Sequence, residues 1–332
     1  MSVLREIQSE YNALVPLAHS LGIFSGVRHL TTTHESIAVG RRRLAELHRR
    51  IALRQPQTMT SVAALTGTQS DTFGVEIECL LPAGMSHHAL AAAITAAGVA
   101  CHAEGYNHIT GSDWKVVTDG SLGSYVTGAE VVSPILSGEA GFLAMKIVMD
   151  AVRLAGCKIN RKCGFHVHVG ARNENVQFFK SLARIYRKFD SAVNSVLAPS
   201  RANNPYAHAH VINQAALDAA TTIDAVTLAV GQRPGAQHVR GVSRYRKLNF
   251  CSYYQHGTIE VRNHQGTVEA NKAAQWVRFC LALVAVARTN PSLVLVEDNL
   301  EALISLLGLD ATQAAYWRSR QTFFATRTQR RA

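Results

Sequence analysis

The spacing of apolar side chains divides the 332-residue chain into parts of different character. In residues 2–54, apolar positions recur every three or four residues, which predicts helices. Residues 54–70 are rich in proline, glycine, serine and threonine, a composition typical of a linker. Strand-like and helix-like segments alternate over residues 71–290. We therefore predict a helical N-terminal module with its linker over residues 1–66, a central domain over residues 67–292, and a helical, arginine-rich C-terminal extension over residues 293–332.

Helical periodicity continues through the central and C-terminal parts. The segments are residues 89–97, 141–154, 175–197, 211–230, 269–287, 296–307 and 311–326. Between them, short segments alternate strictly between apolar and polar side chains, which predicts strands. An Asp-Gly-Ser turn signal at Asp119 predicts a hairpin in which a strand at Lys115 pairs with a strand at Val132.

The first alternating segment, residues 73–79, places two carboxylates on one face of a strand. Because successive side chains point to opposite faces, Glu76 and Glu78 point one way while Val75 and Ile77 point to the core. Two carboxylates roughly 7 Å apart on a rigid strand suit a hard cation. Taken alone, the segment is also explained by a strand with one solvated face.

The second alternating segment, residues 163–170, places His166 and His168 on one face, with Gly164 and Gly170 at its ends. Two imidazoles at this spacing can lie around one metal ion or phosphate. Two surface histidines without a role are the alternative. Because glycine weakens a strand and often marks the close approach of a ligand, we favour a functional role.

The third alternating segment, residues 257–264, places Glu260 and Arg262 on one face. Arginine binds phosphate or carboxylate through two parallel hydrogen bonds, and a cross-strand ion pair is the alternative. Glu130 opens a further short strand and is a third source of carboxylate for the same ligand. Together these strands supply carboxylate, imidazole and guanidinium groups, which predicts a metal-dependent active site that binds phosphate.

Composition and charge exclude several classes of protein. With 47% hydrophobic and 17% charged residues, the chain is not largely disordered, and no apolar run approaches the roughly 20 residues of a membrane span. The N-terminal residues mix acids and bases, so we expect no signal peptide. Six scattered cysteines favour reduced thiols in the cytoplasm over a disulfide framework. The net charge of +11 favours anionic partners, among which nucleic acid is a candidate that we do not favour.

A series of short segments resembles, in order and spacing, the motifs of the amidoligase family. This family is frequent in phages and is similar to the catalytic fold of glutamine synthetase and glutamate–cysteine ligase. The segments are residues 73–78, 119–122, 130–134, 163–168, 245–249 and 258–262. The resemblance covers residues 71–290. It implies an α+β fold in which an antiparallel sheet, packed by helices, holds divalent ions on a concave face between ATP and a carboxylate substrate.

The resemblance also implies a role for individual residues. The metal ligands are Glu76, Glu78, Glu130, His166 and Glu260; the residues near the ATP phosphates are His168, Arg262 and Arg246; and the residues assigned to catalysis are Asp119, Arg262 and Arg246. Asp119 would take a proton from the attacking amine. Its motif follows the Glu-x-Glu strand here, whereas the similar motif of glutamine synthetases precedes that strand.

The reaction that the resemblance implies is an ATP-dependent ligation of a carboxylate to an amine through an acyl phosphate. Mg²⁺ is the expected ion, and a histidine ligand indicates that Mn²⁺ is also accepted. The sequence leaves the two substrates open, with a peptide or another macromolecule among the candidates, and it leaves the oligomeric state open.

Two alternatives remain at this point. One is a zinc-dependent hydrolase that uses His166, His168 and one glutamate on a single ion. The other is a non-catalytic, basic binding protein of a phage. Of the three, only the ligase needs to turn over ATP.

Overall fold

The computed structural model describes residues 71–107, 109–122, 127–202, 204–235, 244–290 and 295–329, together with a few positions between Gln8 and Leu47. The chain divides into two compact units, Met1–Thr60 and Ser61–Ala332. In the first unit the described positions are helical, and Tyr11, Val15 and Leu47 are buried. The predicted linker over residues 54–70 and most of the predicted N-terminal module lie outside the described residues. The predicted division into three domains therefore stays a prediction.

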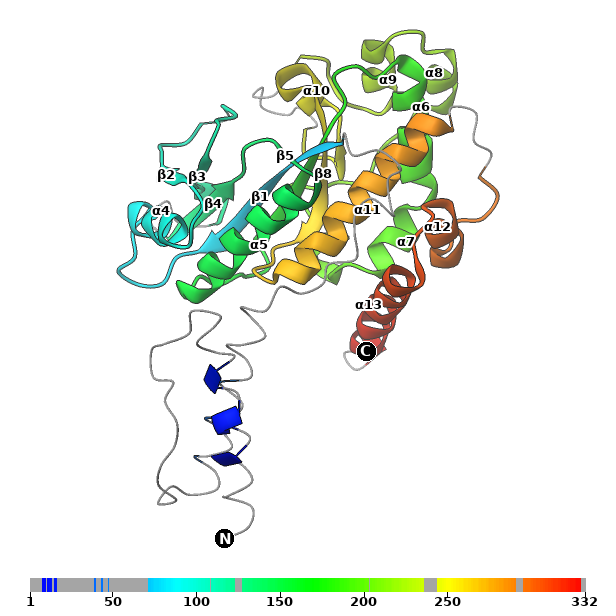
Figure 1. The fold of residues 1–332 in the computed structure, drawn as a ribbon. Coiled ribbons are helices and arrows are strands. Elements are labelled where there is room, and N and C mark those ends of the chain that lie inside the picture. Colours follow the sequence, from blue (N-terminus) through cyan, green and yellow to red (C-terminus); the bar gives the residue numbers. More distant parts are fainter. Residues whose placement is uncertain are drawn as a thin grey trace. The chain divides into compact units, whose positions relative to one another are not determined.

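One mostly antiparallel sheet forms the centre of the second unit. Within the part of this unit that the structure describes, eight strands are joined in the order β2-β3-β4-β1-β6-β8-β7, and β5 pairs with the start of β1 (Figure 1). The strands are β1 (Thr72–Leu80), β2 (Cys101–Ala103), β3 (Trp114–Thr118), β4 (Gly128–Val132), β5 (Leu136–Ser137), β6 (Gly164–Gly170), β7 (Leu248–Asn249) and β8 (Thr258–Gln265). Only β2 and β3 run parallel among these described pairs. Lys115 of β3 lies opposite Val132 of β4, which confirms the predicted hairpin.

Most helices follow the predicted periodicity, but the predicted helices over residues 175–197 and 211–230 are each divided in two, and the helix over residues 251–256 was not predicted. The helices described in this unit are α4 (His87–Ala96), α5 (Gly138–Leu154), α6 (Val176–Lys188), α7 (Asp190–Ser195), α8 (Gln214–Ala219), α9 (Ile223–Ala229), α10 (Cys251–His256), α11 (Ala270–Thr289), α12 (Leu300–Leu306) and α13 (Ala311–Gln329). The predicted helix over residues 211–230 is divided into α8 and α9. Thr222 lies in the break, where its hydroxyl accepts a hydrogen bond from the Ala225 amide and caps α9. Within the described ranges, no helix is long and apolar enough to cross a membrane.

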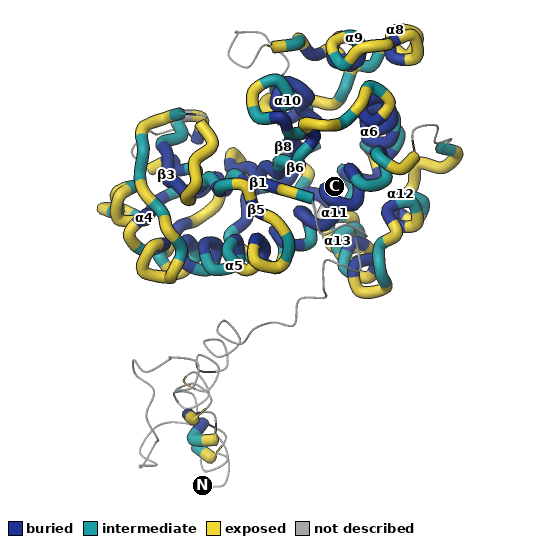
Figure 2. Tube along the Cα trace, turned by 45° about the horizontal axis from the view of Figure 1, so that its top comes forward, coloured by how far each residue is buried: buried dark blue, intermediate teal, exposed yellow. Residues whose placement is uncertain are grey.

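Helices α5 and α11 lie side by side across one face of the sheet (Figure 1). Phe73 of β1 packs on Phe142 of α5, with ring centroids 4.9 Å apart. Val75 and Ile77 share this face of β1 and are buried, and the covered strands form the dark interior in Figure 2. The alternate residues of β1, Glu76 and Glu78, therefore point to the opposite face. The predicted α+β fold, an antiparallel sheet packed by helices, is confirmed.

The C-terminal helix α13 contributes aromatic side chains to the hydrophobic core of this unit. The ring of Trp317, which is 2% exposed, lies 6.0 Å from the ring of Trp276 and 5.3 Å from the ring of Phe279, both on α11. Trp276 and Phe279 stack on each other with ring centroids 4.9 Å apart. The three rings form one continuous apolar contact between α11 and α13.

Replacing Trp317 with alanine is expected to lower the free energy of unfolding by about 3–5 kcal/mol, because it removes a large ring from the core and leaves a cavity. Urea denaturation followed by circular dichroism measures this change. The control is Phe323→Ala, on the same helix but at a side chain that is 43% exposed. It should lower the free energy of unfolding by about 1 kcal/mol or less. Equal stability of the two variants would contradict a structural role for Trp317.

Candidate metal centre

The predicted carboxylates and histidines lie close together because their strands are neighbours in the sheet. Residues that lie opposite one another in an antiparallel pair share a face of the sheet. The opposite pairs are Glu76 with His166, Glu78 with Glu130, and His168 with Glu260. Strands β4, β1, β6 and β8 thus present these side chains on the face away from α5. From the sequence we could predict only that side chains of one strand share a face. The structure brings side chains of four strands together on that face.

Glu76 belongs to two groups of side chains, each compact enough to hold one cation. The first group is Glu76, His168 and Glu260, and the second is Glu76, Glu130 and His166. Within each group the ligand atoms, one from each residue, lie within 4.8 Å of one another. Glu76 Oε1 lies 3.2 Å from His168 Nε2, and Glu76 Oε2 lies 2.8 Å from His166 Nδ1. The carboxylate of Glu76 therefore directs one oxygen to each histidine.

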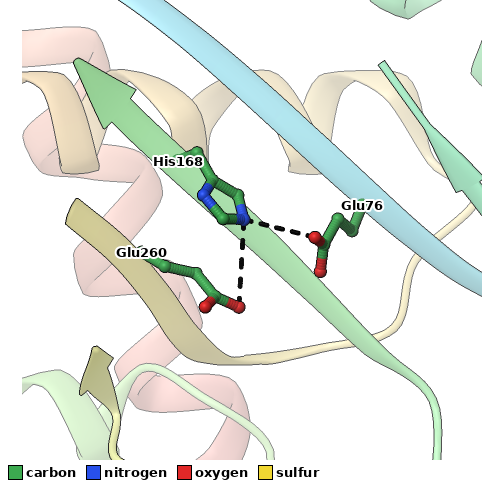
Figure 3. A group of neighbouring side chains, drawn as sticks. All are labelled: Glu76, His168 and Glu260. Carbon is green, nitrogen blue, oxygen red and sulfur yellow. Dashed lines mark hydrogen bonds and ion pairs between the residues drawn. The ribbon is translucent and has the colours of Figure 1, made fainter. Parts of the chain in front are cut away.

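The first group faces a common centre (Figure 3). His168 Nε2 lies between the two carboxylates and is 4.0 Å from Glu260 Oε1. The other ring nitrogen, Nδ1, contacts the hydroxyls of Thr258 at 2.9 Å and Ser252 at 3.1 Å. These contacts fix the orientation of the imidazole, as second partners of metal-binding histidines commonly do.

Glu260 is held on both of its oxygens. Asn249 Nδ2 donates to Oε2 at 2.7 Å, and the Arg262 guanidinium forms an ion pair with Oε1. Both Glu260 and Arg262 are buried. Arg262 therefore forms its ion pair with a residue of its own strand, and the cross-strand pair of the alternative interpretation is not the one observed here.

Glu78 lies beside the second group rather than within it. Its Oε2 accepts a hydrogen bond of 2.6 Å from the backbone amide of Gly164, and its Oε1 lies 3.4 Å from His166 Nε2. Gly164 also leaves room for the imidazole, because a Cβ built on it would lie 2.7 Å from His166 Nε2. The glycine at the start of β6 thus supports both a carboxylate and a histidine of the site.

The electrostatics of the second group favour a cation. Burial, and then the negative charges of Glu76 and Glu78, hold the pKa of Glu130 well above its ordinary value. A divalent cation would offset this repulsion and stabilise the ionised carboxylate. Carboxylate oxygens with an imidazole nitrogen are ligands that Mg²⁺ and Mn²⁺ accept. The residues present therefore fit a divalent ion.

The pKa values of two other carboxylates of the site, Glu76 and Glu260, are lowered, because each carboxylate has positively charged or hydrogen-bonding partners. Burial raises the pKa of Glu76, but hydrogen bonds with His166 and His168 outweigh it and hold that pKa well below its ordinary value. Burial likewise raises the pKa of Glu260, but the charges of Arg262 and the two histidines together outweigh it, so the net shift is downward. Both carboxylates are therefore ionised and available as ligands at neutral pH.

Two residues that were predicted to take part in catalysis lie outside both groups. Asp119 follows β3, and its Oδ1 accepts a hydrogen bond of 2.8 Å from the Ser121 amide. Its charge adds to the raised pKa of Glu130, so it lies near the second group. Arg246 donates to the carbonyl of Ala209 at 2.8 Å, and among the described residues no ion pair joins it to a carboxylate of the site. The catalytic roles of Asp119 and Arg246 stay predictions.

The structure adds supporting residues for which no role was predicted. Asn249 stands in the segment over residues 245–249 that resembles a family motif, and this motif was the available signal. Arg201 is 2% exposed and donates to the carbonyl of Arg262 at 2.7 Å. It belongs to a short 3₁₀ turn, Pro199–Arg201, whose sequence shows neither strand alternation nor a motif. No sequence pattern indicated Arg201.

A pocket of about 940 Å³ opens beside the metal centre, and Glu76, Glu130 and His168 form part of its wall. The rest of the wall comes from the start of β1, the loop before β3, the segments that follow β4 and β6, the junction between α10 and β8, and the end of α11. The pocket is large enough for a small-molecule substrate next to the two groups.

Comparison with known protein families places the chain in one of them. The family described as "Putative amidoligase enzyme" matches residues 69–284, which is more than half of the chain. The chain belongs to the amidoligase family. The matched segment includes every carboxylate and histidine of the metal centre, and the family predicted from the motifs is confirmed, while phage origin stays a prediction.

Comparisons with individual proteins add less about this amidoligase. No curated protein matches its sequence. A solved structure described as "Crystal structure of novel glutamine synthase homolog" is similar over 77% of this chain, at 12% sequence identity and a TM-score of 0.36. The amidoligase covers 65% of that structure's chain.

Gly164→Ala is expected to weaken Mn²⁺ binding by about tenfold or more, because the added methyl group displaces the His166 ring while the backbone keeps its conformation. Isothermal titration calorimetry measures the affinity. Gly105→Ala is the matched control, since a Cβ at that position meets nothing within 4 Å. Unchanged Mn²⁺ affinity in the Gly164 variant would show that His166 does not bind the ion.

Proposed function

We propose that this amidoligase joins a carboxylate to an amine at the expense of ATP. Membership of the amidoligase family supports a ligase-type function. The observation that supports the finer proposal is the carboxylate of Glu76, which two adjacent ligand groups share. Two ions held by a common carboxylate suit a phosphoryl transfer, in which one ion can stabilise the attacking oxygen and the other the leaving oxygen.

The metal centre would hold Mg²⁺ or Mn²⁺ through Glu76, Glu130, His166, His168 and Glu260, with Glu78 next to them. When bound, the ions supply charge neutralisation for the phosphates of ATP. Arg262, buried beside Glu260, is the proposed contact for the transferred phosphoryl group.

In the proposed reaction, an oxygen of the substrate carboxylate attacks the γ-phosphorus of ATP, and ADP leaves with the electrons of the broken bond. The nitrogen of the amine then attacks the carbonyl carbon of the acyl phosphate, and inorganic phosphate leaves as the amide forms. The amine loses one proton in this step, for which Asp119 is the proposed acceptor. Arg246 is retained as a proposed phosphate contact. A cytoplasmic location belongs to the proposal, since ATP is found there and all six cysteines are free thiols.

The zinc hydrolase alternative gains little support from the geometry. It requires His166 and His168 on one ion, yet within the described residues the two histidines fall into different ligand groups. The non-catalytic alternative is separated from the ligase by ATP turnover.

The decisive experiment measures ADP formation with Mg²⁺, a pool of amino-acid and peptide carboxylates, and hydroxylamine as the amine. A ligase is expected to release ADP and to form hydroxamates, which are detected by their colour with ferric ions. ADP release that depends on Mg²⁺ and is not supported by Zn²⁺ alone would support the proposal. Absence of ADP formation under all of these conditions would contradict it and favour a binding protein.

Glu76→Gln is expected to remove high-affinity binding of both ions, because the shared carboxylate loses its charge in both groups. Calorimetric titration with Mn²⁺ should show about two sites in the wild type and a loss of affinity of about a hundredfold or more in the variant. Glu139→Gln, at an exposed glutamate in the first turn of α5, is the matched control and should bind as the wild type does. Loss of only one of the two sites would show that Glu76 is not shared.

Arg262→Lys is expected to lose at least about tenfold in the rate of ADP formation although it keeps the positive charge. Lysine cannot make the planar, two-bond contact of a guanidinium with phosphate. Steady-state kinetics measures the effect, and thermal denaturation checks the fold. A rate within about threefold of the wild type, roughly 0.7 kcal/mol in the barrier, would leave Arg262 only its ion pair with Glu260.

A further inference from the structure

The pocket beside the metal centre contains cationic side chains, and most of them already have acidic partners. Lys115 is 3% exposed, and its Nζ lies 3.4 Å from Glu104 Oε2. Arg288 forms ion pairs with Asp71 at 2.9 Å and with Glu174 at 2.5 Å. The charges of these two residues are therefore compensated within the protein.

Arg172, which lines the same pocket, differs from them. Among the described residues no carboxylate pairs with it. Its side chain is exposed, and within the described residues its one hydrogen bond is long, 3.5 Å from Nη2 to the carbonyl oxygen of His256. A guanidinium has five N–H donors, so the described residues leave most of the hydrogen-bonding capacity of Arg172 available to a ligand.

The guanidinium of Arg172 lies against the backbone of Gly257. A Cβ built on this glycine would be 3.0 Å from Arg172 Nε and 3.1 Å from Cζ. Gly257 ends α10 with a φ of +67°, a conformation that favours glycine. The turn between α10 and β8 thus provides a flat surface on which the guanidinium rests.

This position is close to the first ligand group. Thr258 follows Gly257 directly, and its hydroxyl contacts Nδ1 of His168 at 2.9 Å. His168 in turn contacts Glu76, and both line the pocket together with Arg172. An anion bound by Arg172 would therefore lie next to the metal centre and within the same pocket.

We propose that Arg172 is a substrate-binding residue that holds an anionic group, a phosphate or a carboxylate, in the pocket beside Glu76 and His168. The flat guanidinium is suited to two parallel hydrogen bonds with either group. The inference deepens the proposed function, on which it rests in so far as the anion belongs to a substrate of the ligase. The phosphate would come from the nucleotide, and the carboxylate from the acceptor.

The experiment titrates the full-length protein with two simple anions in the presence of excess Mg²⁺, pyrophosphate for the phosphate source and glutarate for the carboxylate source. Arg172→Gln is compared with the wild type, with Arg172→Lys, and with Arg187→Gln, a matched change at an exposed arginine of α6. ATP is titrated in parallel. Calorimetry gives the affinities, and Mn²⁺ titration confirms that the metal centre is intact in each variant.

Arg172→Gln should weaken the binding of one of the two anions by about tenfold or more, as expected for the loss of a charged hydrogen-bonding partner. Arg172→Lys should recover part of the affinity, and Arg187→Gln should have no effect. A loss confined to pyrophosphate assigns the site to the nucleotide, and a loss confined to glutarate assigns it to the acceptor.

Two outcomes would overturn the proposal: equal affinities for both anions in the wild type and Arg172→Gln, or no binding of either anion to the wild type. The ATP titration tests the proposed ligase function and not the anion site. If ATP does not bind while one anion binds in an Arg172-dependent manner, the proposed ligase function fails and the anion site stands.

Discussion

The repulsion among carboxylates on one face of the sheet is the constraint on which the rest of the site depends. Glu76, Glu78, Glu130 and Glu260 project from three strands onto one surface, and burial makes their charges costly. The protein compensates part of this charge with imidazole, guanidinium and amide donors. Glu130 keeps a raised pKa because these donors interact mainly with Glu76, Glu78 and Glu260. The uncompensated remainder lies at Glu130 in the second ligand group, so the same imbalance that is costly to the protein alone favours a cation there.

Strand periodicity was sufficient to predict which side chains share a face. Glu76 and Glu78, His166 and His168, and Glu260 were selected from alternation alone, and the register places them on one surface. The hairpin from Lys115 to Val132 was also predicted, because its turn signal is local. The order of the strands was not available from periodicity. No strand order was predicted, since pairing between distant segments leaves no mark in a single sequence.

The remaining parts of the site depend on contacts between distant segments. Asn249 reaches Glu260 only because β7 pairs with β8. Arg201 approaches β6 and β8 from a short turn that has no periodic pattern. Arg172 and Gly257 are far apart in sequence, and Arg172 stands in no segment with a recognisable signal. Such residues are positioned by the tertiary fold, which explains why local patterns identified the ligands of the site better than their supports.

The pairing of β1 on both edges has a consequence for local stability. This strand is hydrogen-bonded to β4 and β5 on one side and to β6 on the other, and it carries Glu76 and Glu78. To separate it from the sheet, ladders on both edges must break, which in most proteins requires global unfolding. The walls of the pocket include a loop and a helix–strand junction, which open at lower cost. The spacing of the ligand groups is therefore tied to the lifetime of the whole fold, whereas the pocket beside them can change shape through local fluctuations of its walls.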